Sequence, residues 1–188
     1  MNYFQPLKNL FLVVLLSACF TNCSKEDIGT EDNLARMSVR LKHTSQTVNH
    51  VFLDIRDVQL KLQEVNGSSN WQSLNAINTG VHNVNNFDAD NALLLVDNVD
   101  IEAGYAHEIR LVLGDGNFIN VNNVLHYLDV SNLGADTPSN LINSQLNPQG
   151  HYDLLIDLDI DASVSHNEHE NTMVFNPKIY TAIRQIEY

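Results

Sequence analysis

The stretch DLDIDASVSHNEHE (157–170) concentrates the residue types that bind cations or transfer protons. In an extended strand, alternate residues lie on one face about 7 Å apart, which places Asp157, Asp159 and Asp161 in one row. Hard cations such as Ca²⁺ are bound by several carboxylate oxygens. The three aspartates are therefore a candidate divalent-cation site, with Ca²⁺ as the expected metal.

The same row also has a purely structural explanation. It extends back through Leu155 to Asp153, whereas residues of the other parity are apolar or aromatic and predict a core face. Carboxylates this close repel one another unless they are neutralised. Lys178 or Arg184 from a neighbouring strand would supply the balancing charge. Because the spacing fits no EF-hand loop, both explanations stay open.

A second group of ligand-type side chains follows in HNEHE, where His166 and His169 alternate with Glu168 and Glu170. Imidazole and carboxylate groups at this spacing would bind a transition metal weakly. The competing interpretation is a polar tip of a hairpin.

Motifs for hydrolysis are missing from the sequence. It contains no nucleophile elbow, no zinc-protease motif and no isolated catalytic cysteine. A carboxylate pair for glycoside cleavage is defined by geometry, so the sequence leaves a hydrolase as an alternative. We predict that the protein is not an enzyme and needs no cofactor.

The N-terminus has the pattern of a secretory signal. Lys8 precedes an unbroken apolar run, Leu10–Leu16, which ends in small residues before Cys19. The run is too short to span a bilayer, which needs roughly 20 residues. We predict a lipoprotein signal peptide at residues 1–18.

LSAC (Leu16–Cys19) closely resembles the lipobox of bacterial lipoproteins, whose cysteine is acylated and becomes the new N-terminus. Several acyl chains, palmitate among them, hold a protein stably at a membrane. We therefore predict lipidation at Cys19. Cys23 is the alternative, because the SKED that follows it resembles the tract after the anchor in surface lipoproteins of the Bacteroidetes type. A disulfide between the two cysteines would close too small a loop to stabilise much.

The net charge of the chain limits the partners that we expect. Ten basic and 23 acidic residues give a net charge of −13, which argues against nucleic acid and anionic membrane surfaces as partners, since both carry negative charge. Contact with a membrane is then expected only through the lipid. The polar, aperiodic residues 19–34 predict a flexible lipidated tether, followed by one domain at 35–188. The expected location is the cell envelope, on the outer membrane, facing the periplasm or the cell surface.

The candidate side chains must be positioned by strands, because apolar and polar residues alternate from residue 35 onward. Within the strand expected at Val51–Val65, the apolar positions change parity between Ile55 and Val58. Both sets face the core only if one extra residue is accommodated. We therefore predict a β-bulge or sharp bend at Arg56–Asp57.

Further short strands and turns are expected along the rest of the chain. The strands are expected at Met37–Leu41, Trp71–Leu74, Gly80–Phe87, Ala92–Ile101, Val124–Val130, His151–Ile160 and Lys178–Tyr188. One short helical turn is an alternative within Ala92–Ile101. Ala103–Val121 is expected as two strands joined by a Gly-Asp-Gly-Asn turn, Asn122–Asn123 as a tight hairpin turn, and 131–149 as a long loop. Trp71 is expected either to pack or to serve as a ligand platform. The pattern predicts a single antiparallel β-sandwich.

Several segments also resemble a known family in their order and spacing. They are MSVRL, HVFLDIRDVQLKLQ, AGYAHEIRLVLGDGNFINVNNVLHYLDV, YDLLIDLDIDASV and PKIYTAIRQI, and they are similar to the bacterial domain-of-unknown-function 4382 family. The resemblance covers about residues 35–187 and implies a lipoprotein-borne sandwich of transthyretin- or immunoglobulin-like type. The chain departs from the family at Lys42, His43 and Thr44, where Asp-Ala-Pro is usual. The family has no established activity, so it implies no catalytic residues.

Together, these features predict a lipid-anchored envelope protein whose β-sandwich presents loops or an edge strand to a glycan or protein partner. The alternative is a divalent-cation module that uses the acidic face at Asp157–Asp161.

Overall fold

Alternation of apolar and polar residues makes most of this chain fold as β-strands. The structure is a computed structural model that describes residues 33–45, 49–63, 69–130 and 134–187. The predicted signal peptide (1–18), Cys19 and Cys23 lie outside the described residues. The elements are β1 (Leu34–Thr44), β2 (His50–Gln63), β3 (Ser69–Ser73), β4 (Gly80–Asn83), η2 (Val84–Asn86), β5 (Leu93–Glu102), β6 (Gly104–Leu113), β7 (Phe118–Val121), β8 (Val124–Asp129), β9 (Ser139–Leu146), β10 (His151–Asp159), α2 (Ile160–Ser163), β11 (Val164–Asn167), β12 (Thr172–Phe175) and β13 (Lys178–Ile186).

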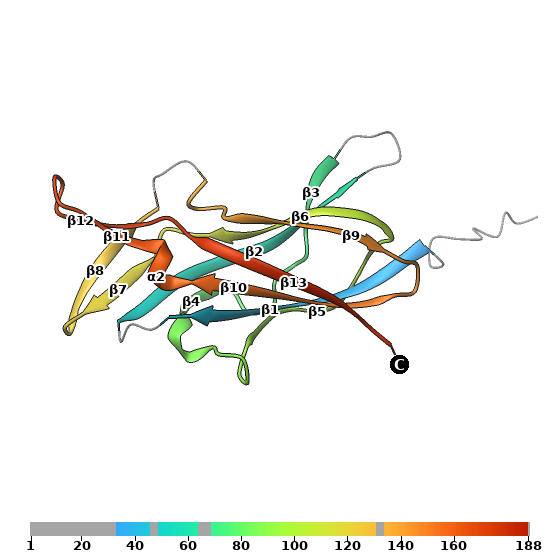
Figure 1. The fold of residues 1–188 in the computed structure, drawn as a ribbon, viewed down its shortest axis with the longest axis horizontal. Helices are drawn as coiled ribbons and strands as arrows, with labels where there is room; N and C mark the ends of the chain where they lie inside the picture. The colour runs from blue at the N-terminus through green and yellow to red at the C-terminus, as the bar shows by residue number, and fades with distance from the viewer. Residues whose placement is uncertain (1–32, 46–48, 64–68, 131–133, 188) are drawn as a thin grey trace, which may run out of the picture. The chain divides into compact units, whose positions relative to one another are not determined.

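The strands form two sheets packed as a β-sandwich, which confirms the predicted all-β class (Figure 1). One sheet has four strands in the order β13-β10-β1-β5. The other has nine, in the order β11-β12-β8-β7-β2-β6-β9, with β3 and β4 also paired to β2. The predicted antiparallel pairing describes most strand pairs, but β1 pairs in parallel with β10 and β12 pairs in parallel with β8. Parallel pairing needs a long connection, and most of the chain lies between β1 and β10.

The core lies between the inner faces of the two sheets. Every second residue of β1, from Ala35 to Leu41, is fully buried. The even-numbered residues of β10, from Tyr152 to Leu158, are buried beside them. The odd-numbered residues of β10 therefore lie on the outer face of the four-stranded sheet, as the alternation predicts.

The predicted bulge in β2 is confirmed. The register with β6 shifts between Ile55 and Asp57, so that Arg56 is exposed while Ile55 and Val58 are both buried. The extra residue lets one strand contribute two apolar sets of opposite parity to the same core.

The Gly-Asp-Gly-Asn turn is confirmed and is bonded to this bulge. Asn117 is completely buried, its Oδ1 accepts from the backbone N–H of Asp54 at 3.0 Å, and its Nδ2 donates to the carbonyl of Gly114 at 2.6 Å. Gly114 lies so close to Asp54 that a Cβ added there would be 2.8 Å from the carboxyl carbon. The turn between β6 and β7 and the bulge in β2 are therefore one bonded unit.

The hairpin turn at Asn122–Asn123 is also confirmed. Both residues have positive φ, 52° and 65°, and they join β7 to β8 in the register of a two-residue loop. The predicted terminal pair is present as well, with β10 antiparallel to β13.

Three predictions of local structure are wrong. The strand expected at Gly80–Phe87 ends at Asn83, and Val84–Asn86 forms the short 3-10 helix η2. Ala92–Ile101 contains no helical turn, because Leu93–Glu102 pairs along β1 as β5 and buries Leu95 and Ile101. The segment 131–149 is not simply a loop, because Ser139–Leu146 forms β9 at the edge of the larger sheet. Helical structure occurs instead at η2 and at α2, where the Asp159 side chain accepts from the N–H of Ala162 at 2.9 Å. Among the described residues, no helix has both the length and the apolar character to cross a membrane.

Candidate functional site

The row of aspartates lies on the outer face of β10, between the basic residues of β1 and β13. Arg40 of β1 donates from Nη1 to Oδ1 of Asp153. Arg184 of β13 donates to Oδ2 of the same carboxylate from Nε at 3.1 Å and from Nη2 at 2.7 Å. The Asp153 carboxylate thus bridges two guanidinium groups. Arg184 is one of the two residues, Lys178 or Arg184, that were expected to balance the charge of the acidic row.

The three aspartates named as a cation site have different hydrogen-bond partners in the structure. Asp157 accepts from the ammonium of Lys42 and, at 2.8 Å, from the hydroxyl of Thr44. The Asp159 side chain caps α2, whereas Asp161 lies within α2 and accepts from the hydroxyl of Ser45 at 2.8 Å. Within the described ranges, no three His, Cys, Asp or Glu side chains form a group that would hold a metal ion.

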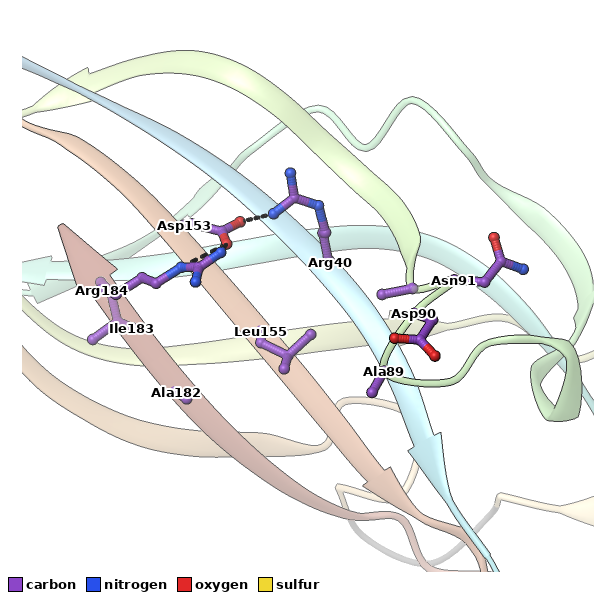
Figure 2. A pocket seen from close by; sticks show the side chains of 10 residues that line it. Arg40, Ala89, Asp90, Asn91, Asp153, Leu155, Ala182, Ile183 and Arg184 are labelled. Atoms are coloured by element: carbon purple, nitrogen blue, oxygen red, sulfur yellow. Dashed lines mark hydrogen bonds and ion pairs between the residues drawn. The ribbon is translucent and has the colours of Figure 1, made fainter. Parts of the chain in front are cut away.

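An open groove of about 620 Å³ lies over this face of the sheet (Figure 2). Leu155 and Ala182 of neighbouring strands provide its apolar floor. Figure 2 shows Arg184 on one side of Leu155 and the loop residues Ala89 and Asp90 on the other. The remaining lining residues are Arg40, Asn91, Ala92, Asp153 and Ile183.

The charged groups of the groove combine a buried anion with exposed cations. The Asp153 side chain is 8% exposed, against 40% for Arg40 and 74% for Arg184. Each guanidinium has five N–H groups, so both arginines keep donors that are not used by Asp153. On the facing loop, the carboxylate of Asp90 has no partner among the described residues. The donors of Arg184 and the carboxylate of Asp90 therefore lie on opposite sides of Leu155, while Arg40 lies on β1 directly beside Leu155 (Figure 2).

The histidine-containing segment is the tip of the β11–β12 hairpin, as predicted. His166 lies 3.2 Å from the side-chain oxygen of Asn171, while Asn167 bonds to the N–H of His169 and to Glu170. The Asn167 side chain therefore orders the turn from within.

Trp71 packs on the outer face of the larger sheet. The guanidinium carbon of Arg110 lies 4.2 Å from the centre of the indole ring, and the ammonium of Lys61 lies 5.5 Å from it. Arg110 is fixed in turn by two bonds to Gln59, at 2.8 and 2.6 Å. This arrangement favours packing over a ligand platform for Trp71.

Sequence reasoning identified Asp153 and Arg184 but missed Arg40 and Asp90 as groove residues. A usable indication was present for Arg40, because Arg36, Arg40 and Lys42 share the polar parity of the first strand. Such a basic row is the natural neighbour of an acidic one. Asp90 lies in a loop without periodicity, and only the fold brings it to the groove.

Comparison with known protein families gives one result. A family model described as a domain of unknown function, DUF4382, matches residues 35–177. Neither a curated protein nor a solved structure matches the chain.

Proposed function

The chain belongs to the DUF4382 family, and from this premise we propose that it is a non-enzymatic binding module, held at the cell envelope by an acylated Cys19, that captures a glycan or protein partner in the groove over the four-stranded sheet. The groove is the single observation that carries the binding role. It combines an apolar floor with donors and an acceptor that the fold leaves available, and such a combination is typical of ligand sites.

The position of the groove supports a binding role. Arg40, Asp153 and Arg184 come from three adjacent strands that are paired along their length, so the backbone that carries them is rigid. The facing residues belong to a loop between β4 and β5, which can vary without disturbing the core. A rigid face opposite a loop is the arrangement in which β-sandwiches present ligand sites.

The chemistry of the groove favours holding a ligand over transforming it. Glycoside hydrolysis needs a carboxyl group that exchanges protons with the substrate. Here both oxygens of Asp153 already accept hydrogen bonds from guanidinium groups, which occupy the positions through which the carboxylate would approach a ligand. The second carboxylate, Asp90, lies on an exposed loop.

The proposed address rests on the sequence before the domain. A lipid on Cys19 would place residues 20–33 between the membrane and the first strand, which begins at Leu34. This is enough chain for the domain to reach partners near the outer membrane. Both the periplasmic and the surface side are compatible with such a tether.

Retention of envelope material by the full chain tests the proposal. The full chain is immobilised from detergent and exposed to solubilised envelope, and the retained glycans and proteins are identified. Ala182→Trp should abolish specific retention, because Ala182 is exposed on the groove floor and a Trp there fills the site. Ala162→Trp, at an exposed position on α2, is the matched control. Equal retention by wild type and Ala182→Trp would refute the groove as the binding site.

A further inference from the structure

We propose that the ligand of the groove is a neutral saccharide, bound through adjacent hydroxyl groups that accept from Arg40 and Arg184 and donate to Asp90. The inference rests on the proposed binding function and deepens it. It follows from the charge, the hydrogen-bonding types and the dimensions of the groove.

The charges that line the groove cancel. Two arginines, Arg40 and Arg184, stand against two aspartates, Asp90 and Asp153. An anionic ligand would gain from the guanidinium groups but would approach Asp90 and a chain of net charge −13. A cationic ligand would meet the exposed side of both arginines. The balance therefore favours a ligand without net charge.

The hydrogen-bonding groups of the groove are of opposite and exclusive types. A guanidinium only donates, and an ionised carboxylate only accepts. A hydroxyl group does both, so a polyol is complementary to both sides of the groove at once. Asn91 adds one more acceptor, since its Nδ2 donates to the carbonyl of Asn86 at 3.2 Å and its side-chain oxygen remains available within the described residues.

Size and location argue against a protein partner at this site. The volume of about 620 Å³ lies within the roughly 300–1,000 Å³ of small-ligand sites, whereas a stable protein interface buries roughly 800 Å² on each partner. A peptide that binds as an added strand needs a free sheet edge. β13 is the edge strand of the four-stranded sheet, but the groove floor is formed by side chains on the face of β10 and β13, so a strand added at that edge would lie beside the groove and not in it.

An apolar surface beside the polar groups suits the other face of a sugar ring. Leu155 and Ala182 form the floor, and Tyr180 is exposed by 59% on the same face of β13, one alternate position further along. The C–H groups of a saccharide would lie on Leu155 and Ala182 and extend toward the Tyr180 ring.

Calorimetry with defined probes tests the inference. The full chain in detergent is titrated with neutral gluco-, manno- and galacto-oligosaccharides, with oligogalacturonate and with a capped hexapeptide. We expect a neutral saccharide to bind, and Arg184→Ala and Asp90→Ala each to weaken binding about 10- to 100-fold, as loss of a hydrogen bond to a charged group predicts. Arg36→Ala is the matched control, because Arg36 lies on the same face of β1 and pairs with Asp100 at 3.1 Å outside the groove. The thermal midpoint of each variant reports that it is folded.

The possible outcomes separate this inference from the function on which it rests. Binding of oligogalacturonate or of the peptide alone would overturn the inference and leave a binding groove. Binding of a neutral saccharide that neither Arg184→Ala nor Asp90→Ala weakens would also overturn it. Failure of every probe, while Ala182→Trp still abolishes retention of envelope material, would overturn the inference alone. Failure of every probe together with loss of that retention difference would overturn both.

Discussion

Replacement of Asn117 tests whether the turn between β6 and β7 and the bulge in β2 are one bonded unit. Asn117→Ala removes the acceptor for the buried N–H of Asp54 and the donor for the carbonyl of Gly114. A buried donor left without a partner costs about 1–3 kcal/mol, and the lost bond to the more accessible Gly114 carbonyl costs about 1 kcal/mol. We expect a total of about 3 kcal/mol of unfolding free energy.

The assay is chemical and thermal unfolding of wild type and variant under identical conditions. For a chain of this length, about 3 kcal/mol corresponds to a fall in Tm of about 6–12 °C. Asp115→Ala, an exposed position in the same turn, is the control and should change the unfolding free energy by less than about 0.5 kcal/mol. Asn117→Asp keeps the shape and the acceptor but loses the donor, so it should also be destabilised. If Asn117→Ala matches Asp115→Ala in Tm, the reasoning from buried hydrogen bonds is refuted.

Three further predictions concern the hairpin, the anchor and the acidic row. Asn123 has a φ of 65°, so Asn123→Val should lower the free energy of unfolding by about 1–2 kcal/mol, as measured by denaturant unfolding. Asn123→Gly should leave that free energy unchanged or raise it. Equal stabilities of the two variants would contradict the argument from positive φ. Cys19→Ser should abolish acylation and leave the chain as an unprocessed precursor, as read by intact mass, while Cys23→Ser should not; the opposite pattern would assign the anchor to Cys23. Calorimetric titration with Ca²⁺ should give no binding heat, because Lys42 and Thr44 already donate to the two oxygens of Asp157. A binding heat that is lost in Asp157→Asn would instead establish a cation site.

Features with a local cause were predictable from the sequence. The parity change between Ile55 and Val58 predicts the bulge, because alternation has only two faces to assign. The Asn122–Asn123 turn was predictable since asparagine tolerates positive φ. The core face of β10 follows from the same alternation.

Features that depend on distant partners were not predictable. The segment at β9 is largely polar and lies at an edge of the sheet, so backbone pairing with β6 defines the strand more than its side chains do. The α2 turn is hidden because Asp159 continues the alternation of β10 and yet caps a helix. Parallel pairing of β1 with β10 joins segments that are far apart along the chain, and no local pattern encodes that choice.

The candidate site shows the same division. Asp153 and its partner Arg184 follow from the acidic row and the cations it needs, and they lie on the paired strands β10 and β13. The groove exists only because β1 supplies Arg40 beside them and the loop before β5 brings Asp90 across from Leu155 (Figure 2). In the fold, Asp153 of this acidic row pairs with Arg40 and Arg184, and Asp157 pairs with Lys42.

Hydroxyl-radical footprinting of the full chain, with and without the envelope glycan it retains, locates the binding surface. We expect bound glycan to protect Leu155 and Tyr180 on the outer face of the four-stranded sheet. We expect no change at Val124, Leu125 and Tyr127, which are exposed on β8 of the other sheet. Protection of the β8 side chains with Leu155 and Tyr180 unchanged would refute binding in the groove and place the binding site at the β7–β8 hairpin.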